Sequence, residues 1–128
     1  MQDDEFLLQF EQCTLPKEYF KHRGHLRITW IYLSKNTLED AMPQIIQGIK
    51  RYAASLGAAH IYHETLTRAW ILLVHSAMLQ CRTICYDDFI VKNEYLLDKS
   101  LIFQYYSPKI LESEDARRIW FEPDLKSL

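Results

Sequence analysis

The chain has 128 residues, 48% of them hydrophobic, and a formal charge of -2 at pH 7 from 15 Lys+Arg and 17 Asp+Glu. This length suits one domain with one hydrophobic core. The balance of charge argues against a nucleic-acid partner, because there is no excess of basic residues to release counterions from a phosphate backbone. The longest apolar run, residues 69–79, is far shorter than the roughly 20 residues of a membrane helix, so we expect no membrane partner either.

The first residues and the cysteines bear on the cellular compartment. The opening stretch, MQDDEFLLQF, lacks the basic start of a secretory signal, and the three cysteines form an odd number without a disulfide framework. We therefore expect free thiols and a cytoplasmic protein. Cys81 and Cys85 are four residues apart and would share one face of a continuous helix, either as metal ligands or, more commonly for free cysteines, as small core residues.

The spacing of the apolar residues predicts the fold class. They recur at intervals of three and four, and only three glycines and four prolines interrupt the chain. This pattern predicts an all-α fold, a single compact bundle of five to seven helices that spans residues 1–128. The expected helices cover residues 5–13, 17 or 22 to 33, 38–56, 59–82 and 87–97, and a structured tail follows with start signals at Ser107 and Ser113.

Local signals fix several of these helix ends. Asp3 and Asp4 place negative charge at the positive end of the first helix dipole. Asn36 or Thr37 can cap the third helix with a side-chain oxygen. Gly57 is the expected end of that helix, because glycine adopts the left-handed conformation at little cost.

Two pairs of histidines are the chief candidates for chemistry. His22 and His25 are three residues apart, and His60 and His63 repeat the spacing. On a helix, residues three apart project to the same side, so two packed helices could present their imidazoles to each other. Converging neutral imidazoles are the ligands that zinc, iron, nickel or manganese require, which predicts a divalent transition metal site.

The residues around the second pair would complete such a site. Glu64 lies four residues after His60 and would share its helix face, as a ligand, as an orienting group or as a catalytic general base on bound water. Tyr62 and Thr67 are placed to bond to a ring nitrogen or to a ligand. The sequence thus allows a metal-dependent enzyme.

A second interpretation needs no metal. His22 and His63 would be core histidines satisfied by the backbone or by Glu64, while His25 and His60 face water. The protein would then be a non-enzymatic helical module that binds a carboxylate or phosphate ligand or another protein, or whose histidines only fasten the tail. The aromatic content, 13% of the chain, also leaves enough apolar surface for a homodimer beside the monomer.

Three sequence blocks resemble a family of small all-helical bacterial proteins. They read F-x-H-x-x-H-L-R-x-x-W, Y-H-E-T-x-T, and a tail with S-x-x-x-L-x-S-x-x-A-R before P-D-L. The resemblance implies a common helical fold and no particular activity. Its pattern includes His63 but not His60, which favours a ligand set of His22, His25 and His63 with open positions for water or substrate. The matching residues are Phe20, His22, His25, Leu26, Arg27 and Trp30; Tyr62, His63, Glu64, Thr65 and Thr67; and Ser107, Leu111, Ser113, Ala116, Arg117, Pro123, Asp124 and Leu125.

Two arginines in these blocks have alternative roles. Arg27 and Arg117 could bind an anionic ligand in a pocket. A pairing with Asp124 or Glu64 that pins the tail against the second helix is the more common use of such arginines. We therefore expect Arg117 and Asp124 to anchor the tail.

Overall fold

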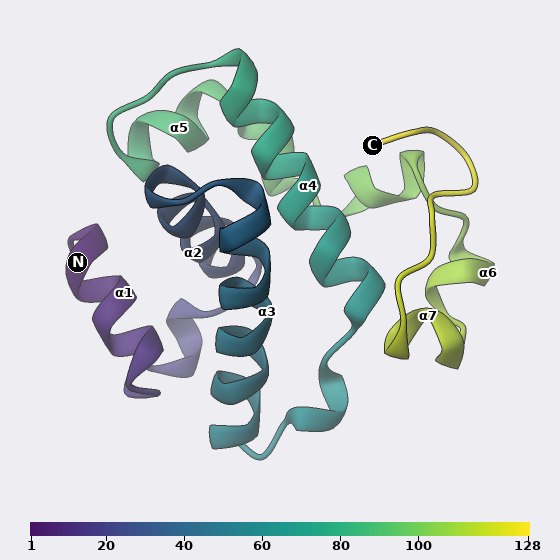
Figure 1. Ribbon diagram of the computed structural model, residues 1–128, viewed down its shortest axis with the longest axis horizontal. Coiled ribbons are helices and arrows are strands. Elements are labelled where there is room, and N and C mark those ends of the chain that lie inside the picture. Colours follow the sequence, from purple (N-terminus) through teal and green to yellow (C-terminus); the bar gives the residue numbers. More distant parts are fainter.

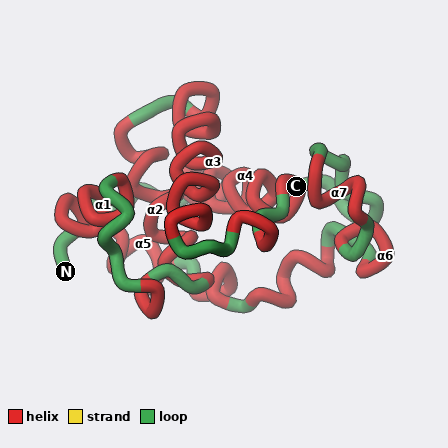
Figure 2. Tube along the Cα trace, turned by 90° about the horizontal axis from the view of Figure 1, so that it is seen from below, coloured by secondary structure: helices red, strands yellow, loops and turns green.

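The computed structural model describes all 128 residues as seven α-helices and four 3₁₀ helices without a strand (Figures 1 and 2). The expected all-α bundle is therefore confirmed. The elements are α1 (Asp3–Glu11), η1 (Lys17–Tyr19), α2 (His22–Lys35), α3 (Leu38–Ser55), η2 (Ala59–Ile61), α4 (Glu64–Gln80), α5 (Tyr86–Lys92), η3 (Glu94–Leu97), η4 (Lys99–Gln104), α6 (Pro108–Leu111) and α7 (Glu114–Arg118).

Helices α2, α3 and α4 pack against one another and form the centre of the molecule. Helix α1 packs against α2 and α3 on one side, while α7 packs against α4, so the N-terminal and C-terminal segments lie on opposite sides of the central helices in Figure 1. None of the helices combines the length and the apolar content that crossing a bilayer requires.

The core is rich in aromatic side chains, whose large buried area dominates the hydrophobic stabilisation. Phe10 is fully buried and stacks on Phe20 with ring centroids 5.1 Å apart, and both rings contact the ring of Tyr52. The Tyr52 hydroxyl donates a hydrogen bond of 2.6 Å to the Leu15 carbonyl, so its polar end is satisfied inside the core. This cluster joins α1, η1 and α3 and supports one wall of the site described below.

The predicted caps are confirmed where they depend on neighbouring residues alone. The Thr37 hydroxyl accepts from the Asp40 amide at 3.2 Å and begins α3. Ser107 and Ser113 cap α6 and α7 in the same way. Gly57 follows α3 with φ at +70°, the left-handed conformation expected of it.

The fourth helix begins later than predicted. Residues 59–61 form a separate 3₁₀ turn, Tyr62 and His63 are extended, and α4 starts at Glu64. His63 caps the helix, because its Nδ1 accepts the Leu66 amide hydrogen at 3.1 Å. The prediction that His60 and His63 share one helical turn is therefore wrong, and Glu64 does not share a helix face with His60.

Two further expectations fail at the far end of α4. The helix ends at Gln80, and Cys81 and Cys85 belong to the following connection, so they do not share a helix face. All three cysteines are free thiols. The expected helix over residues 87–97 is divided at Asn93 into α5 and η3, and η4 follows where no element was predicted.

Candidate functional site

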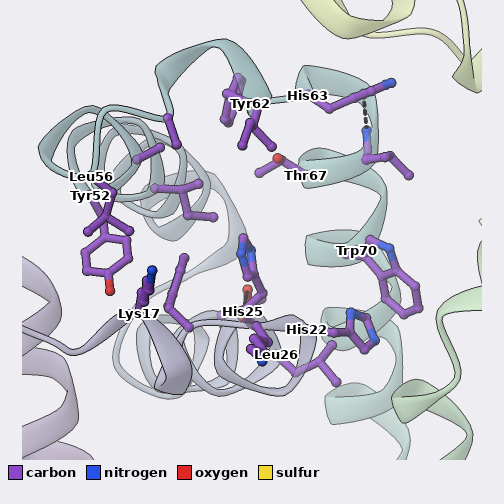
Figure 3. Close-up of a pocket in the computed structure, with 18 of the residues that line it drawn as sticks. Lys17, His22, His25, Leu26, Tyr52, Leu56, Tyr62, His63, Thr67 and Trp70 are labelled. Carbon is purple, nitrogen blue, oxygen red and sulfur yellow. Dashed lines mark hydrogen bonds between the residues drawn. The ribbon is translucent and has the colours of Figure 1, made fainter.

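A cavity of about 590 Å³ opens between α2, α3 and α4 and is bordered by η1 and η2 (Figure 3). It contains three of the four predicted histidines together with the predicted Tyr62 and Thr67, so it is the place where the sequence motifs meet. Its lining residues are Lys17, Phe20, Lys21, His22, His25, Leu26, Thr29, Ile49, Tyr52, Ala53, Leu56, Ala58, Ile61, Tyr62, His63, Leu66, Thr67, Trp70 and Lys99.

His63 lies at the α4 end of the cavity and has partners for both ring nitrogens. Nδ1 accepts from the Leu66 amide, so the proton is on Nε2, which donates to the Leu111 carbonyl at 2.9 Å. Burial lowers the pKa of His63, and the Arg117 charge adds to that effect. The ring is therefore neutral, and its hydrogen-bonding capacity serves the helix cap and the tail.

His22, the first residue of α2, has a protein partner for only one of its two ring nitrogens. Its Nε2 lies 2.8 Å from the Leu96 carbonyl and must donate to it, because a carbonyl oxygen only accepts. The ring meets the indole of Trp70 edge-on, with centroids 4.5 Å apart. Burial lowers the pKa of His22, so the ring is neutral and Nδ1 keeps an unshared lone pair.

His25 differs from the other two because neither ring nitrogen has a hydrogen-bond partner in the protein. Its ring rests on Phe20, with ring centroids 4.2 Å apart, and points into the middle of the cavity in Figure 3. Burial lowers the pKa of His25 to about 4, and the neighbouring His22 and Lys99, which would repel a second positive charge, contribute in the same direction. A neutral imidazole with one donor and one acceptor is thus free to meet a ligand.

Tyr62 and Glu64 form a pair at the edge of the cavity. The Tyr62 hydroxyl donates to Glu64 Oε1 at 2.6 Å, and the same carboxylate lies 3.7 Å from Arg68. Burial raises the pKa of Tyr62, and its hydrogen bond to Glu64 raises it further. Tyr62 and Thr67 line the cavity, whereas Glu64 does not and would act there only through the Tyr62 hydroxyl.

Two predicted site residues lie away from the cavity. His60 is exposed, because the turn η2 directs it outward, and it does not line the cavity. Arg27 donates to Asp3 at 2.9 Å and to the Met1 carbonyl at 2.6 Å, and its guanidinium lies over the Phe6 ring. Arg27 thus fastens α1 to α2, and its predicted pairing with Asp124 or Glu64 is wrong.

The second and third sequence blocks fasten the C-terminal segment, residues 105–128, to the start of α4. Arg117 donates to the carbonyl of Ile61 at 2.9 Å, so it anchors the tail through the backbone and not through Asp124 or Glu64. Asp124 instead accepts from the Ser107 amide at 2.8 Å and closes the tail on itself. Thr65, which is fully buried, is a further anchor between α4 and the tail.

The Thr65 hydroxyl forms two hydrogen bonds with the backbone of the extended tail segment around residue 120. It donates to the Ile119 carbonyl at 2.8 Å and accepts from the Phe121 amide at 3.1 Å. The Tyr106 hydroxyl then donates to the Phe121 carbonyl at 2.6 Å. The Thr65 hydroxyl therefore uses both its donor and its acceptor to hold the tail.

Three lysines at the cavity were not predicted as site residues. Lys17, Lys21 and Lys99 are exposed around its mouth, and none of them forms an ion pair. Lys17 and Lys21 lie on either side of Phe20 in the sequence, and this closeness to the first block could have marked them as site residues. No sequence signal pointed to Lys99, because the turn η4 that carries it was not predicted.

A second hollow, of about 830 Å³, lies between α3, α4 and the C-terminal segment. Its charged residues, Glu39, Arg68 and Glu122, are of both signs, and it contains no histidine. The concentration of motif residues therefore distinguishes the first cavity as the candidate site.

The predicted metal ligands do not form a metal-ligating cluster. No group of three or more His, Cys, Asp or Glu side chains is arranged to hold a metal ion. Of the set His22, His25 and His63, only the first two retain a ring nitrogen without a protein partner. The metal site remains a prediction and is now limited to these two imidazoles. His63 could join them only if Nδ1 no longer accepted the Leu66 amide hydrogen.

No family model, no curated protein and no solved structure matches the chain.

Proposed function

We propose that this protein binds a small molecule in the cavity between α2, α3 and α4. His25 carries the proposal, since it is the one motif histidine whose ring nitrogens are both free, and it projects into a largely apolar space. Protein groups occupy the polar atoms of two other side chains of the blocks, His63 and Thr65. The volume of about 590 Å³ falls within the roughly 300–1,000 Å³ of small-molecule pockets.

The walls support a ligand with an apolar body. Ile49 and Ala53 of α3, Leu56 directly after that helix, and Leu66 and Trp70 of α4 all line the cavity. Burying such surface against an apolar ligand contributes about 25 cal/mol per Å². The few polar groups among these walls would fix the orientation of the ligand.

A cavity-filling substitution tests the proposal. Ala53 lines the cavity, whereas its neighbour Ala54 is exposed and does not, so Ala53→Trp and Ala54→Trp form a matched pair. The neutral dye Nile red should bind to the native protein and to Ala54→Trp with one-to-one saturation, and Ala53→Trp should bind it at least about tenfold more weakly. Absence of saturable binding to the native protein, or equal binding by Ala53→Trp, would contradict the proposal.

We propose as a second candidate that a divalent transition metal, zinc, iron, nickel or manganese, is held by His22 and His25. The bond from His22 Nε2 to the Leu96 carbonyl favours this candidate, because metal-binding histidines commonly donate their other N–H to a backbone carbonyl. Two imidazoles would leave several coordination positions for water or substrate. Catalysis there would make the protein a metal-dependent enzyme, with the Tyr62–Glu64 pair as the acid–base group.

Elemental analysis of tag-free protein purified without chelator tests this second candidate. Near-stoichiometric metal should be lost in His22→Ala and His25→Ala and kept in His60→Ala, whose ring is exposed. A blank, together with no rise in melting temperature on adding the four metals, would remove the candidate and leave the cavity as a site for an organic ligand.

A further inference from the structure

The charges around the cavity are all of one sign. Lys17, Lys21 and Lys99 surround its mouth without ion-pair partners, and no Asp or Glu side chain lines it. The chain as a whole has a formal charge of -2, so this positive edge is a local feature and not a reflection of overall composition. Clefts lined by one sign of charge attract ligands of the opposite sign.

Lys99 and the two α2 histidines form a polar corner. The Lys99 ammonium is close enough to affect the titration of both His22 and His25. Asp98, which precedes Lys99, acts on His22, but its carboxylate does not line the cavity and accepts from the amide and hydroxyl of Ser100. An anionic group at this corner would meet the ammonium of Lys99 and an N–H of His25.

The remainder of the cavity is mostly apolar, with Thr29, Tyr62 and Thr67 among its polar lining residues. Ile49 of α3 and Leu66 of α4 line it, and the exposed side chains of Leu56 and Ile61 belong to its rim. A ligand with charge at one end and hydrocarbon at the other would match both parts. A small inorganic anion would leave the apolar walls unused.

The donor set favours a carboxylate over a phosphate. No arginine lines the cavity, and arginine forks are the usual partners of phosphate groups. One ammonium and one neutral imidazole N–H suffice for the two oxygens of a carboxylate. A dianion would need more donors than this corner offers.

We infer that the cavity binds an amphipathic monocarboxylate, with the carboxylate at Lys99 and His25 and the hydrocarbon between α3 and α4. This inference rests on the proposed function, because it specifies the ligand of the same cavity. His25 then selects the head group, and the apolar walls select the tail.

Calorimetric titration with octanoate, 1-octanol and octylamine tests the ligand class. Octanoate should bind about tenfold or more tightly than 1-octanol, because a hydrogen-bonded charge is worth more than a hydroxyl at this corner. Acetate should bind weakly, since it lacks the hydrocarbon. Added salt should weaken the binding of octanoate and leave that of 1-octanol unchanged.

Variants identify the polar corner. Lys99→Gln should weaken octanoate binding about three- to fivefold, as expected for an exposed charge, whereas Lys109→Gln removes an exposed, unpaired lysine elsewhere and should have no effect. His25→Phe keeps a ring against Phe20 and removes both nitrogens. It should reduce the preference for octanoate over 1-octanol to the roughly three- to fivefold that Lys99 still supplies, while 1-octanol still binds, which also reports that the variant is folded.

The outcomes separate the inference from the proposed function. Octyl phosphate, titrated in the same way, extends the comparison to a dianionic head group. Equal binding of octanoate and 1-octanol, or tighter binding of octylamine or octyl phosphate than of octanoate, would overturn the carboxylate assignment. If none of these probes binds but Nile red does, the inference fails and the binding cavity stands. If Nile red also fails to bind, both fail together.

Discussion

His63 Nε2 lies 2.9 Å from the carbonyl oxygen of Leu111, 48 positions further along the chain, while Nδ1 of the same ring caps α4. One neutral imidazole therefore begins a central helix and holds the C-terminal segment against it. This double role removes His63 from the set of free imidazoles that the sequence suggested.

Replacing His63 should destabilise the protein. His63→Ala deletes the cap and leaves the Leu111 carbonyl and the Leu66 amide without their partner, which should lower the free energy of unfolding by about 2 kcal/mol. His63→Asn should lose less, because an asparagine oxygen still caps. Urea denaturation measures both. His60→Ala serves as the control and should match the native protein, since its ring is exposed; an unchanged midpoint for His63→Ala would refute the double role.

Thr65 should control the order of the tail more than the stability of the bundle centre. Thr65→Val keeps the shape of the side chain and removes the bonds to Ile119 and Phe121, at a cost of about 1–3 kcal/mol. Amide hydrogen exchange should accelerate selectively over residues 119–128. Thr67→Val is the matched control, because the Thr67 hydroxyl lies beside Tyr62 and bonds to no group of the tail; equal protection of the tail in both variants would show that Thr65 is not its anchor.

The parts of the fold that were predictable are those that neighbouring residues determine. Helix α3 follows from its apolar stripe and from Thr37, whose cap involves the amide of Asp40 three residues on. Ser107 and Ser113 act through equally local bonds. Periodicity and capping are therefore sufficient for these elements.

The parts that failed depend on contacts between distant residues. The start of α4 is set by the His63 ring, whose second partner, Leu111, is remote in sequence. The partner of His22 is Leu96, 74 positions away. A spacing of three in the sequence therefore indicated the correct helix face for His22 and His25 on α2, but it could not say which ring nitrogens the backbone would occupy. Lys99 belongs to the site because the turn η4 places it there, and no periodic pattern in the sequence indicates that turn.

Gly24 is required where η1 approaches α2. A Cβ atom built there would collide with the Tyr19 carbonyl oxygen, although α2 continues through the glycine without a break. Gly24→Ala should therefore lower the free energy of unfolding by about 1–3 kcal/mol. Gly57→Asn is the control. Its Cβ meets nothing within 4 Å, and asparagine tolerates the left-handed conformation, so the loss should stay below about 1 kcal/mol. Thermal unfolding ranks the two variants, and the opposite ranking would show that η1 can move aside.

Acidification should destabilise the protein through its buried histidines, and His25 should contribute most. Burial lowers the pKa of His25 from 6.5 to about 4 in the folded protein, and His22 on the same helix and Lys99 on η4 act in the same direction. No carboxylate lines the cavity to oppose them. Between these two pKa values the unfolded chain binds more protons than the folded one, so stability is complete above about pH 7 and falls as the pH drops.

The expected loss from His25 is about 2 kcal/mol between pH 7.5 and pH 5. Urea unfolding at a series of pH values measures it, in buffers free of carboxylates that could occupy the cavity. His25→Phe should reduce the slope over this range by about that amount, whereas His60→Ala should leave the slope unchanged because its ring is exposed. Identical pH profiles for His25→Phe and the native protein would mean that the His25 ring is hydrated as in the unfolded chain, which would remove the neutral imidazole on which the binding site depends.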